Sequence, residues 1–234
     1  MRIYQNPFQA VKETEREMRE MAIDNQSYSS QDLVVEDDPN YQTKELIGYA
    51  YKIDPYWSDK DLDDILDYFQ IPKDWVEAEF QERINPFKLN PGEAWKLRAD
   101  IWTRFLHKGK FSYSYGERYW PQLSKIIDEL TKHPTSRQII LQMYDWPKDM
   151  PKWGGKARIP CSLTYQFLVR NDELHCIYNM RSCDFITFFA SDIVLTLKLL
   201  QRVAKCISIK IGTFTHFIGS LHAYRKDIDA RGIF

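Results

Sequence analysis

The chain has 234 residues, of which 44% are hydrophobic and 15% aromatic, enough to bury one substantial core. Its formal net charge is -1 and no long block of lysine or arginine occurs, which argues against duplex nucleic acid or an anionic membrane surface as the main partner. No apolar run is long enough to span a membrane and no signal-peptide pattern follows Met1, so we expect a cytoplasmic protein.

The N-terminal part of the chain predicts helices around one long strand. Residues 6–21 have the apolar spacing of an amphipathic helix that begins at Asn6-Pro7. The polar, acidic residues 24–40 predict a loop with a short strand at 33–35, and the β-forming residues 45–54 predict the first long strand. Two further helices are predicted at residues 61–69 and 75–83.

The middle of the chain predicts two helices, one strand and two loops. Residues 91–106 place their large apolar side chains on one face of a single helix, and residues 119–133 repeat that pattern before Pro134. The loop between them is rich in hydroxyl groups and ends at Tyr115-Gly116. A buried strand is predicted at residues 138–144, with Arg137 at its start, and a structured loop at residues 145–155.

The C-terminal part predicts a hairpin, the longest helix and a last strand. Residues 163–169 and 173–179 are β-rich runs joined by the turn-forming residues 170–172, the helix covers residues 191–207, and the strand covers residues 212–224. Neither an internal repeat nor a linker interrupts these elements. We therefore predict one α+β domain covering residues 1–234, in which residues 1–40 form an N-terminal helix and a polar loop.

The cysteines of this chain lack the spacing of a zinc site, so we expect free thiols and no metal. Cys176 and Cys206 lie within strand or helix core patterns, where a cysteine is usually an inert packing residue. Cys161 follows a proline at the start of a strand. Either interpretation, a buried packing residue or a nucleophile, is open for it.

A compact Arg181-Ser182-x-Asp184 cluster follows Cys161 after one predicted hairpin. A guanidinium fork beside a hydroxyl is a combination that holds a phosphate, and Arg137 could add a second fork. Nearby arginines would also favour the thiolate of Cys161. No glycine-rich phosphate loop is present, which disfavours an ordinary nucleoside triphosphate enzyme. The sequence therefore predicts a site for a small anionic ligand beside a cysteine nucleophile.

Three runs of the chain resemble thymidylate synthases in order and in spacing. They are Ile-Pro-Cys161-Ser-Leu-Thr-Tyr-Gln-Phe, Met-Arg181-Ser-Cys-Asp184 and Gly-Ser-Leu-His222-Ala-Tyr224. Weaker matches are Pro-Thr-Ser-Arg137, the Tyr115-Gly116 pair and Glu77-Ala-Glu-Phe, which is similar to the family's Glu-x-x-Trp motif. The resemblance implies a thymidylate synthase-like fold, in which a mixed β-sheet is layered with helices and two copies form a homodimer through the sheet.

The resemblance also implies a role for each matching residue. Cys161 would add to C6 of a pyrimidine nucleotide, and Glu77 would organise water and proton transfer. Asp184 would orient the folate co-substrate, 5,10-methylenetetrahydrofolate. The substrate-binding residues would be Arg137, Arg181 and Ser182 at the phosphate, His222 and Tyr224 at the sugar 3′-hydroxyl, and Tyr115 of the Tyr-Gly loop. Arg137 would reach into the site of the neighbouring subunit.

Asp192 stands where thymidylate synthases have an asparagine that recognises uracil. A carboxyl group can accept from the exocyclic amine of cytosine and can supply a proton to its N3, so this aspartate favours cytosine. Together with the other motifs it resembles the phage deoxycytidylate hydroxymethylases, a branch of the same family. The alternative is that Asp192 is a helix N-terminal residue that the dipole stabilises, and both interpretations are compatible.

The chain ends at Phe234, soon after the His222-x-Tyr224 motif, so we expect a missing or short C-terminal closing segment and a site that water can reach. We therefore predict a folate-dependent deoxycytidylate 5-hydroxymethyltransferase that forms 5-hydroxymethyl-dCMP. The alternatives are a dUMP methylase, a dUMP hydroxymethylase and a catalytically silent homologue that binds nucleotide. The partners predicted are nucleotide, folate and a second copy of the chain, without direct nucleic acid or membrane binding.

Overall fold

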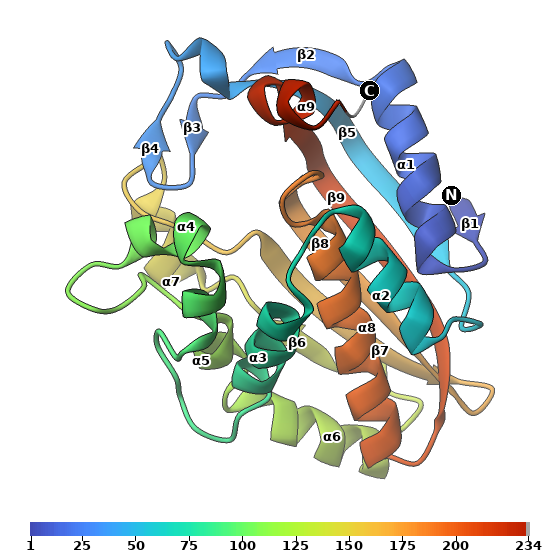
Figure 1. The fold of residues 1–234 in the computed structure, drawn as a ribbon. Coiled ribbons are helices and arrows are strands. Elements are labelled where there is room, and N and C mark those ends of the chain that lie inside the picture. The colour runs from blue at the N-terminus through green and yellow to red at the C-terminus, as the bar shows by residue number, and fades with distance from the viewer. Residues whose placement is uncertain (233–234) are drawn as a thin grey trace.

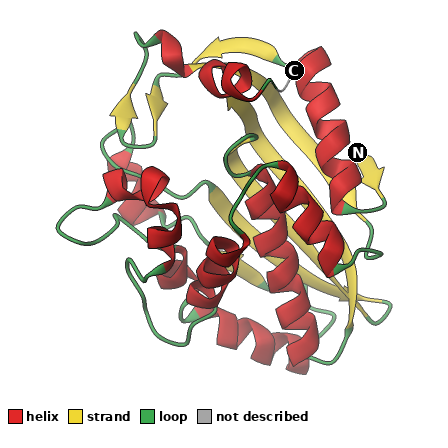
Figure 2. Ribbon diagram, in the orientation of Figure 1, coloured by secondary structure: helices red, strands yellow, loops and turns green. Residues whose placement is uncertain are grey.

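The computed structural model describes residues 1–232, and a seven-stranded mixed sheet forms its centre (Figures 1 and 2). The strands of this sheet are β1 (Arg2–Tyr4), β2 (Ile23–Gln26), β5 (Gln42–Ile53), β6 (Ile140–Gln142), β7 (Ser162–Arg170), β8 (Glu173–Asp184) and β9 (Lys210–Tyr224). Their order is β1-β5-β9-β8-β7-β6, and β2 pairs with β5 beside that path. β8 and β9 are parallel, whereas β5 is antiparallel to β9 and β7 is antiparallel to β8. The predicted α+β class is confirmed.

Helices cover one face of this sheet. Figure 1 shows α2 (Asp59–Tyr68), α3 (Lys73–Arg83) and α8 (Phe189–Cys206) in front of the strands. The helix α8 is apolar along most of its length and packs against β8 and β9, which explains why so many of its residues are buried. The remaining α-helices are α1 (Pro7–Met21), α4 (Ala99–Trp102), α5 (Tyr115–Tyr119), α6 (Gln122–Lys132), α7 (Trp146–Asp149) and α9 (Arg225–Arg231).

Local sequence signals fix several helix starts. The Asn6 side chain accepts a hydrogen bond from the Gln9 amide at 2.9 Å, so α1 begins at the predicted Asn-Pro pair. Ser58 and Asp61 form a reciprocal capping box at the start of α2, and Ser114 and Glu117 form another at the start of α5. These caps satisfy backbone donors that would otherwise lack partners.

A buried row of rings crosses the centre of the sheet. Tyr165, Tyr178, His216 and Tyr51 are register partners on β7, β8, β9 and β5. The Tyr165 and Tyr178 rings stack with centroids 4.2 Å apart, and the Tyr51 hydroxyl bonds to His216 Nδ1 at 2.9 Å. Burial lowers the pKa of His216 to about 3, so its ring is neutral. The Tyr178 hydroxyl bonds to Ser162, which connects this row to the residue after Cys161.

The structure corrects the prediction of one helix at residues 91–106. This segment folds as the 3-10 turn Ala94–Arg98, the short helix α4 and the 3-10 turn Thr103–Phe105. Arg98 interrupts it with φ -138° and ψ 48°, and its buried guanidinium lies 4.5 Å from the centroid of the Trp75 ring. Burying that side chain against α3 overrides the helical spacing.

Two other predicted elements also differ. The predicted helix at residues 119–133 is divided between α5 and α6 at Pro121, which lacks an amide hydrogen for the helix ladder. The predicted buried strand at residues 138–144 is only the short β6, at the edge of the sheet, with Ile140 exposed. In contrast, the predicted β7–β8 hairpin is confirmed, and Asn171 and Asp172 adopt the positive φ angles of 51° and 58° that a tight hairpin turn requires.

A second, two-stranded sheet lies outside the main one. It consists of β3 (Ser29–Ser30) and β4 (Leu33–Val34), within the segment predicted as a polar loop with a short strand. Figure 1 shows this hairpin beside the main sheet. Over residues 1–232, no helix combines the length and apolar character needed to cross a membrane.

Candidate active site

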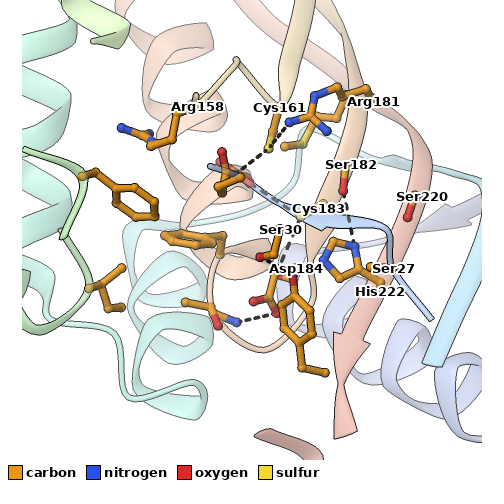
Figure 3. Close-up of a pocket in the computed structure, with 18 of the residues that line it drawn as sticks. Ser27, Ser30, Arg158, Cys161, Arg181, Ser182, Cys183, Asp184, Ser220 and His222 are labelled. Carbon is orange, nitrogen blue, oxygen red and sulfur yellow. Dashed lines mark hydrogen bonds between the residues drawn. The ribbon is translucent and has the colours of Figure 1, made fainter. Parts of the chain in front are cut away.

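A cavity of about 700 Å³ lies where the C-terminal ends of β8 and β9, the first turn of α8 and the β3–β4 hairpin meet (Figure 3). This volume suits a drug-sized or larger ligand. Eight of the ten residues predicted for the site line this cavity: Tyr115, Cys161, Arg181, Ser182, Asp184, Asp192, His222 and Tyr224. Glu77 and Arg137 do not line it. The structure thus brings together most of the predicted residues from elements far apart in the sequence.

Cys161 lies in the cavity wall just before β7, beside the guanidinium of Arg181. Arg181 Nη2 is 3.6 Å from Cys161 Sγ, and Arg181 Nε donates to the Pro160 carbonyl at 3.0 Å. The Arg181 amide also donates to the Cys161 carbonyl at 2.8 Å. These bonds fix the guanidinium against the peptide that carries the thiol. Arg181 therefore supplies a fixed positive charge beside the sulfur, and the thiolate is the nucleophilic form of cysteine.

A row of polar side chains continues along the parallel strands β8 and β9. Ser182 Oγ lies 3.3 Å from His222 Nδ1, and Figure 3 shows both side chains turned toward one another. The Tyr224 hydroxyl bonds to Ser30 Oγ at 2.9 Å, and burial raises the pKa of Tyr224 to about 12, so this phenol is protonated. Hydroxyl and imidazole groups in such a row can donate to and accept from the hydroxyl groups of a sugar.

Asp192 lies in the first turn of α8 and faces the cavity. Its Oδ2 is 3.6 Å from the sulfur of Cys183, whose thiol donates to it. Burial raises the pKa of Asp192 to about 7, although the positive charge of Arg83 opposes this rise. Near neutral pH this carboxyl group therefore exists in both forms and can either donate or accept a proton.

Asp184 ends β8 and is held by the backbone of the loop that follows. Its Oδ1 accepts from the amides of Ile186 and Thr187 at 3.0 and 3.2 Å. Tyr115 is fixed in a similar way, because its hydroxyl bonds to Ser162 Oγ at 3.1 Å and its ring lies 4.1 Å from the Arg83 guanidinium carbon. Both side chains are therefore held in place before any ligand arrives.

The structure does not bring Glu77 to the cavity. Its side chain is 52% exposed on the outer side of α3 and pairs with Lys198 at 2.9 Å. Glu79, two residues further on, lies on the opposite side of this helix, is 19% exposed and pairs with Arg83 at 2.8 Å. Successive residues of an α-helix are separated by about 100°, so a shift of two positions reverses the face. Glu79 is the carboxylate of this motif that points inward, and its charge acts on Asp192.

Arg137 lies at the surface of its own subunit. Its carbonyl accepts from Gln166 Nε2 at 2.9 Å, and its side chain is exposed outside the cavity. This position leaves its expected role in a neighbouring subunit as a prediction.

Arg158 is a cavity residue that the sequence-based prediction of the site missed. It is 7% exposed and its guanidinium carbon lies between 4.7 and 5.6 Å from the ring centroids of Trp102, Phe105, Phe111 and Tyr113. Its Nη2 donates to the Tyr113 hydroxyl at 3.3 Å. Within residues 1–232, no carboxylate lies at ion-pair distance from it. An arginine immediately before Ile-Pro-Cys161 was the available signal, but the rings that surround it come from a distant segment.

The same region gives the cavity an aromatic half. Trp75, Trp102, Phe105, Tyr113 and Phe188 line it, opposite the polar row of β8 and β9. Flat aromatic walls suit a flat heterocyclic ligand, because offset stacking with such rings is favourable. The described part of the chain contains no cluster of three or more side chains able to hold a metal ion.

A cysteine beside a fixed arginine, a hydroxyl and imidazole row and an aromatic wall define a site suited to covalent chemistry on a heterocyclic ligand. The family model described as thymidylate synthase matches residues 76–232. The chain therefore belongs to the thymidylate synthase family.

Curated relatives support this assignment. The chain is 32% identical over 130 residues to a bifunctional dihydrofolate reductase-thymidylate synthase of Paramecium tetraurelia, which covers 55% of this chain and 27% of the relative. It is 29% identical over 132 residues to a putative thymidylate synthase of Methanocaldococcus jannaschii, with 56% and 60% covered. A thymidylate synthase of Listeria monocytogenes is 28% identical over 166 residues, with 63% and 50% covered. The chain thus spans less than two thirds of these relatives.

A solved structure shows the same fold. The crystal structure of thymidylate synthase from T4 phage matches 94% of this chain and 79% of that chain, with a TM-score of 0.66 and 18% sequence identity. The predicted thymidylate synthase-like fold is therefore confirmed.

Proposed function

We propose that the protein transfers a one-carbon unit from 5,10-methylenetetrahydrofolate to C5 of dCMP with addition of water, so that 5-hydroxymethyl-dCMP and tetrahydrofolate are released. The observation that carries this proposal is the Asp192 carboxyl group, which shares a cavity with Cys161 and has its pKa raised by burial to about 7. The proposal combines this geometry with the membership of the thymidylate synthase family.

Asp192 matches cytosine better than uracil. When a thiolate adds to C6, negative charge develops on the base, and N3 of cytosine must take up a proton. A carboxyl group that is partly protonated near neutral pH can supply this proton and can accept from the exocyclic amine. Uracil already carries a hydrogen on N3 and has a carbonyl in place of the amine, which suits an amide better.

The remaining cavity residues would each contact a different part of the nucleotide. Cys161 would form the bond to C6, and Arg181 with Ser182 would hold the phosphate. His222 and Tyr224 would bind the sugar hydroxyl, where their fixed positions on β9 reduce the entropy lost on binding. Tyr115, anchored through Ser162, would orient the bound nucleotide.

The aromatic half of the cavity fits the folate co-substrate. The rings of Trp102 and Phe188 would stack on its flat bicyclic end, and Asp184 would accept hydrogen bonds from its ring nitrogens. When bound, this co-substrate supplies the methylene carbon that the activated nucleotide takes up. The protein's part is to bind it beside the nucleotide and to keep both rings oriented.

A second candidate is the methylation of dUMP, the reaction of a thymidylate synthase. It is supported by the names of the curated relatives, which are thymidylate synthases or bifunctional proteins that contain one. A dUMP hydroxymethylase would use the same fold and nucleophile. A silent nucleotide-binding homologue is less well supported, because it would have no chemical need for both a thiol and a carboxyl group of raised pKa in one cavity.

Product analysis separates these functions. The protein would be incubated with methylenetetrahydrofolate and either dCMP or dUMP, the nucleotide product identified by mass, and dihydrofolate followed by its absorbance. Hydroxymethylated dCMP without dihydrofolate is the expected result. Methylated dUMP with dihydrofolate would instead establish the thymidylate synthase reaction. An Asp192→Asn variant should shift the preference from dCMP toward dUMP, and a Cys161→Ala variant should lose turnover with either.

We also propose that two copies pair through the sheet face opposite α8. Ile140 and Phe217 are 45% and 42% exposed, although both lie on strands of the central sheet. Exposed apolar side chains on a sheet face favour a partner surface. A pair formed in this way would let Arg137 reach the phosphate of the neighbouring site, as the family resemblance implies.

A further inference from the structure

The β3–β4 hairpin brings another polar side chain to Cys161. Gln31, at the hairpin tip, lines the cavity, and its Nε2 lies 3.6 Å from Cys161 Sγ, the same distance as Arg181 Nη2. The preceding residue, Ser30, bonds to the Tyr224 hydroxyl at 2.9 Å. One hairpin tip therefore contacts both the thiol and a residue of the polar row.

Gln31 is unfavourable for the hairpin in two ways. Its φ of 57° lies in the left-handed region, where glycine is preferred and a glutamine is strained. Its Oε1 is buried and has no hydrogen-bond partner within residues 1–232. A glycine would remove both disadvantages. A side chain kept under such conditions is best explained by what its other polar atom contacts, which here is the sulfur of Cys161.

Packing on both sides holds the hairpin tip in place. The Val35 amide donates to the Tyr28 carbonyl at 2.9 Å, which closes the base of the hairpin. At Gly155, a Cβ atom would lie 3.1 Å from the Leu33 carbonyl carbon, so the loop before Cys161 packs closely against the strand. Gln31 therefore reaches the thiol from a fixed backbone.

We propose that Gln31 is a positioning residue for Cys161, and that its amide N–H acts together with the Arg181 guanidinium to stabilise the thiolate. Hydrogen bonds to a charged acceptor favour the charged form. A neutral amide adds this stabilisation without adding charge to the anion-binding side of the cavity. The proposal concerns the thiol itself and holds for either pyrimidine substrate.

The test is the pH profile of Cys161 alkylation by iodoacetamide, followed by the mass of the peptide that contains Cys161. The variants are Gln31→Gly, which removes the amide, and Gln31→Glu, which puts a carboxylate next to the sulfur. Gln70→Gly is the matched control, because Gln70 has a similar φ of 54° but is exposed and lies outside the cavity.

The expected result is a profile midpoint about 1 pH unit higher for Gln31→Gly, a tenfold smaller thiolate fraction below the midpoint, with a larger shift for Gln31→Glu. Gln70→Gly should keep the native midpoint. Easier access to the thiol would change the plateau rate but not the midpoint, so the two effects are separable. The titratable and charged groups around Cys161 in the cavity are unchanged in every variant, among them Tyr113, Tyr115, Arg158, Arg181, Cys183, Asp184, Asp192, His222 and Tyr224.

A native midpoint in the Gln31→Gly variant would overturn the inference, because the carboxylate of Gln31→Glu raises the midpoint by its own charge. Thermal unfolding adds a structural control, because both glycine variants should keep or raise the melting temperature. Alkylation needs no nucleotide, so this result is independent of the proposed function. A shifted midpoint without turnover on dCMP or dUMP would reject only the proposed function, and turnover with unshifted midpoints would reject only the role of Gln31.

Discussion

Asp192 links stability to pH through a single side chain. Its pKa of about 7 in the folded chain lies above the value of 3.8 for a free aspartate, so the folded state binds this proton more tightly. The resulting stabilisation is complete below about pH 4 and is lost as the pH rises toward 7. From about pH 5 to about pH 8 the native protein should lose roughly 2–3 kcal/mol from this group.

The Asp192→Asn variant should lack this loss, because an amide does not titrate. Urea unfolding at both pH values measures the free energy of unfolding of each protein. At the higher pH the stability of the variant should rise relative to that of the native protein. Parallel pH dependences for the two proteins would contradict a carboxyl group of raised pKa.

The glutamates of α3 provide a second prediction for single residues. Glu79→Gln should lower kcat by roughly tenfold, because the charge of Glu79 helps to raise the pKa of Asp192 and a neutral amide would not. Glu77→Gln is the matched control and should leave kcat within about threefold, because its exposed pair with Lys198 is worth less than about 1 kcal/mol. Steady-state kinetics on both variants measure these changes in kcat. Equal losses would place the functional carboxylate elsewhere.

At the scale of elements, the contact between β8 and β9 positions Arg181. A Cβ atom on Gly219 would lie 2.8 Å from the Arg181 carbonyl oxygen, so Gly219→Ala must separate the strands. We expect a loss of about 1–3 kcal/mol in stability and a KM for nucleotide raised by several fold. Gly212→Ala on the same strand is the control, since its Cβ would lie 2.7 Å from the ring of His175 and not beside Arg181. It should leave KM unchanged, and a raised KM in both variants would argue against a local effect on Arg181.

The sequence could predict the position of a residue where a local signal within one element fixes it, and could not where contacts between elements do. The sequence could place Cys161 and Arg181 in one cavity because their signals are local, a proline-cysteine at a strand start and an Arg-Ser pair at a strand end. Glu79 was missed because the period of α3 did not reveal which of two glutamates faces inward. Arg98 and Arg158 take their positions from distant aromatic rings, and Gln31 from a hairpin that the polar residues 24–40 barely indicate. Contacts across the chain, not local patterns, fix these four.

At the scale of the whole molecule, the distance of Arg137 from its own cavity raises the question of whether one chain is a complete enzyme. If Arg137 serves a neighbouring site, Cys161→Ala and Arg137→Ala proteins should complement each other. Each would be inactive alone or strongly impaired. A mixed pair contains one site with both the native thiol and the partner's native arginine, so equal co-expression should restore about a quarter of the native activity by random pairing.

The mixed sample also tests the assembly itself. In sedimentation, both the native protein and the mixed sample should have about twice the chain mass of 27.9 kDa. Replacing the exposed Phe217 by glutamate should shift that mass toward the monomer and lower activity, whereas the same change at the exposed Trp153, outside the sheet, should not alter the mass. If the mixture stays inactive while the pairs remain intact, Arg137 acts within its own chain. A native protein that sediments as a monomer would mean that the phosphate is held without Arg137, by Arg181 and Ser182 of a self-sufficient cavity.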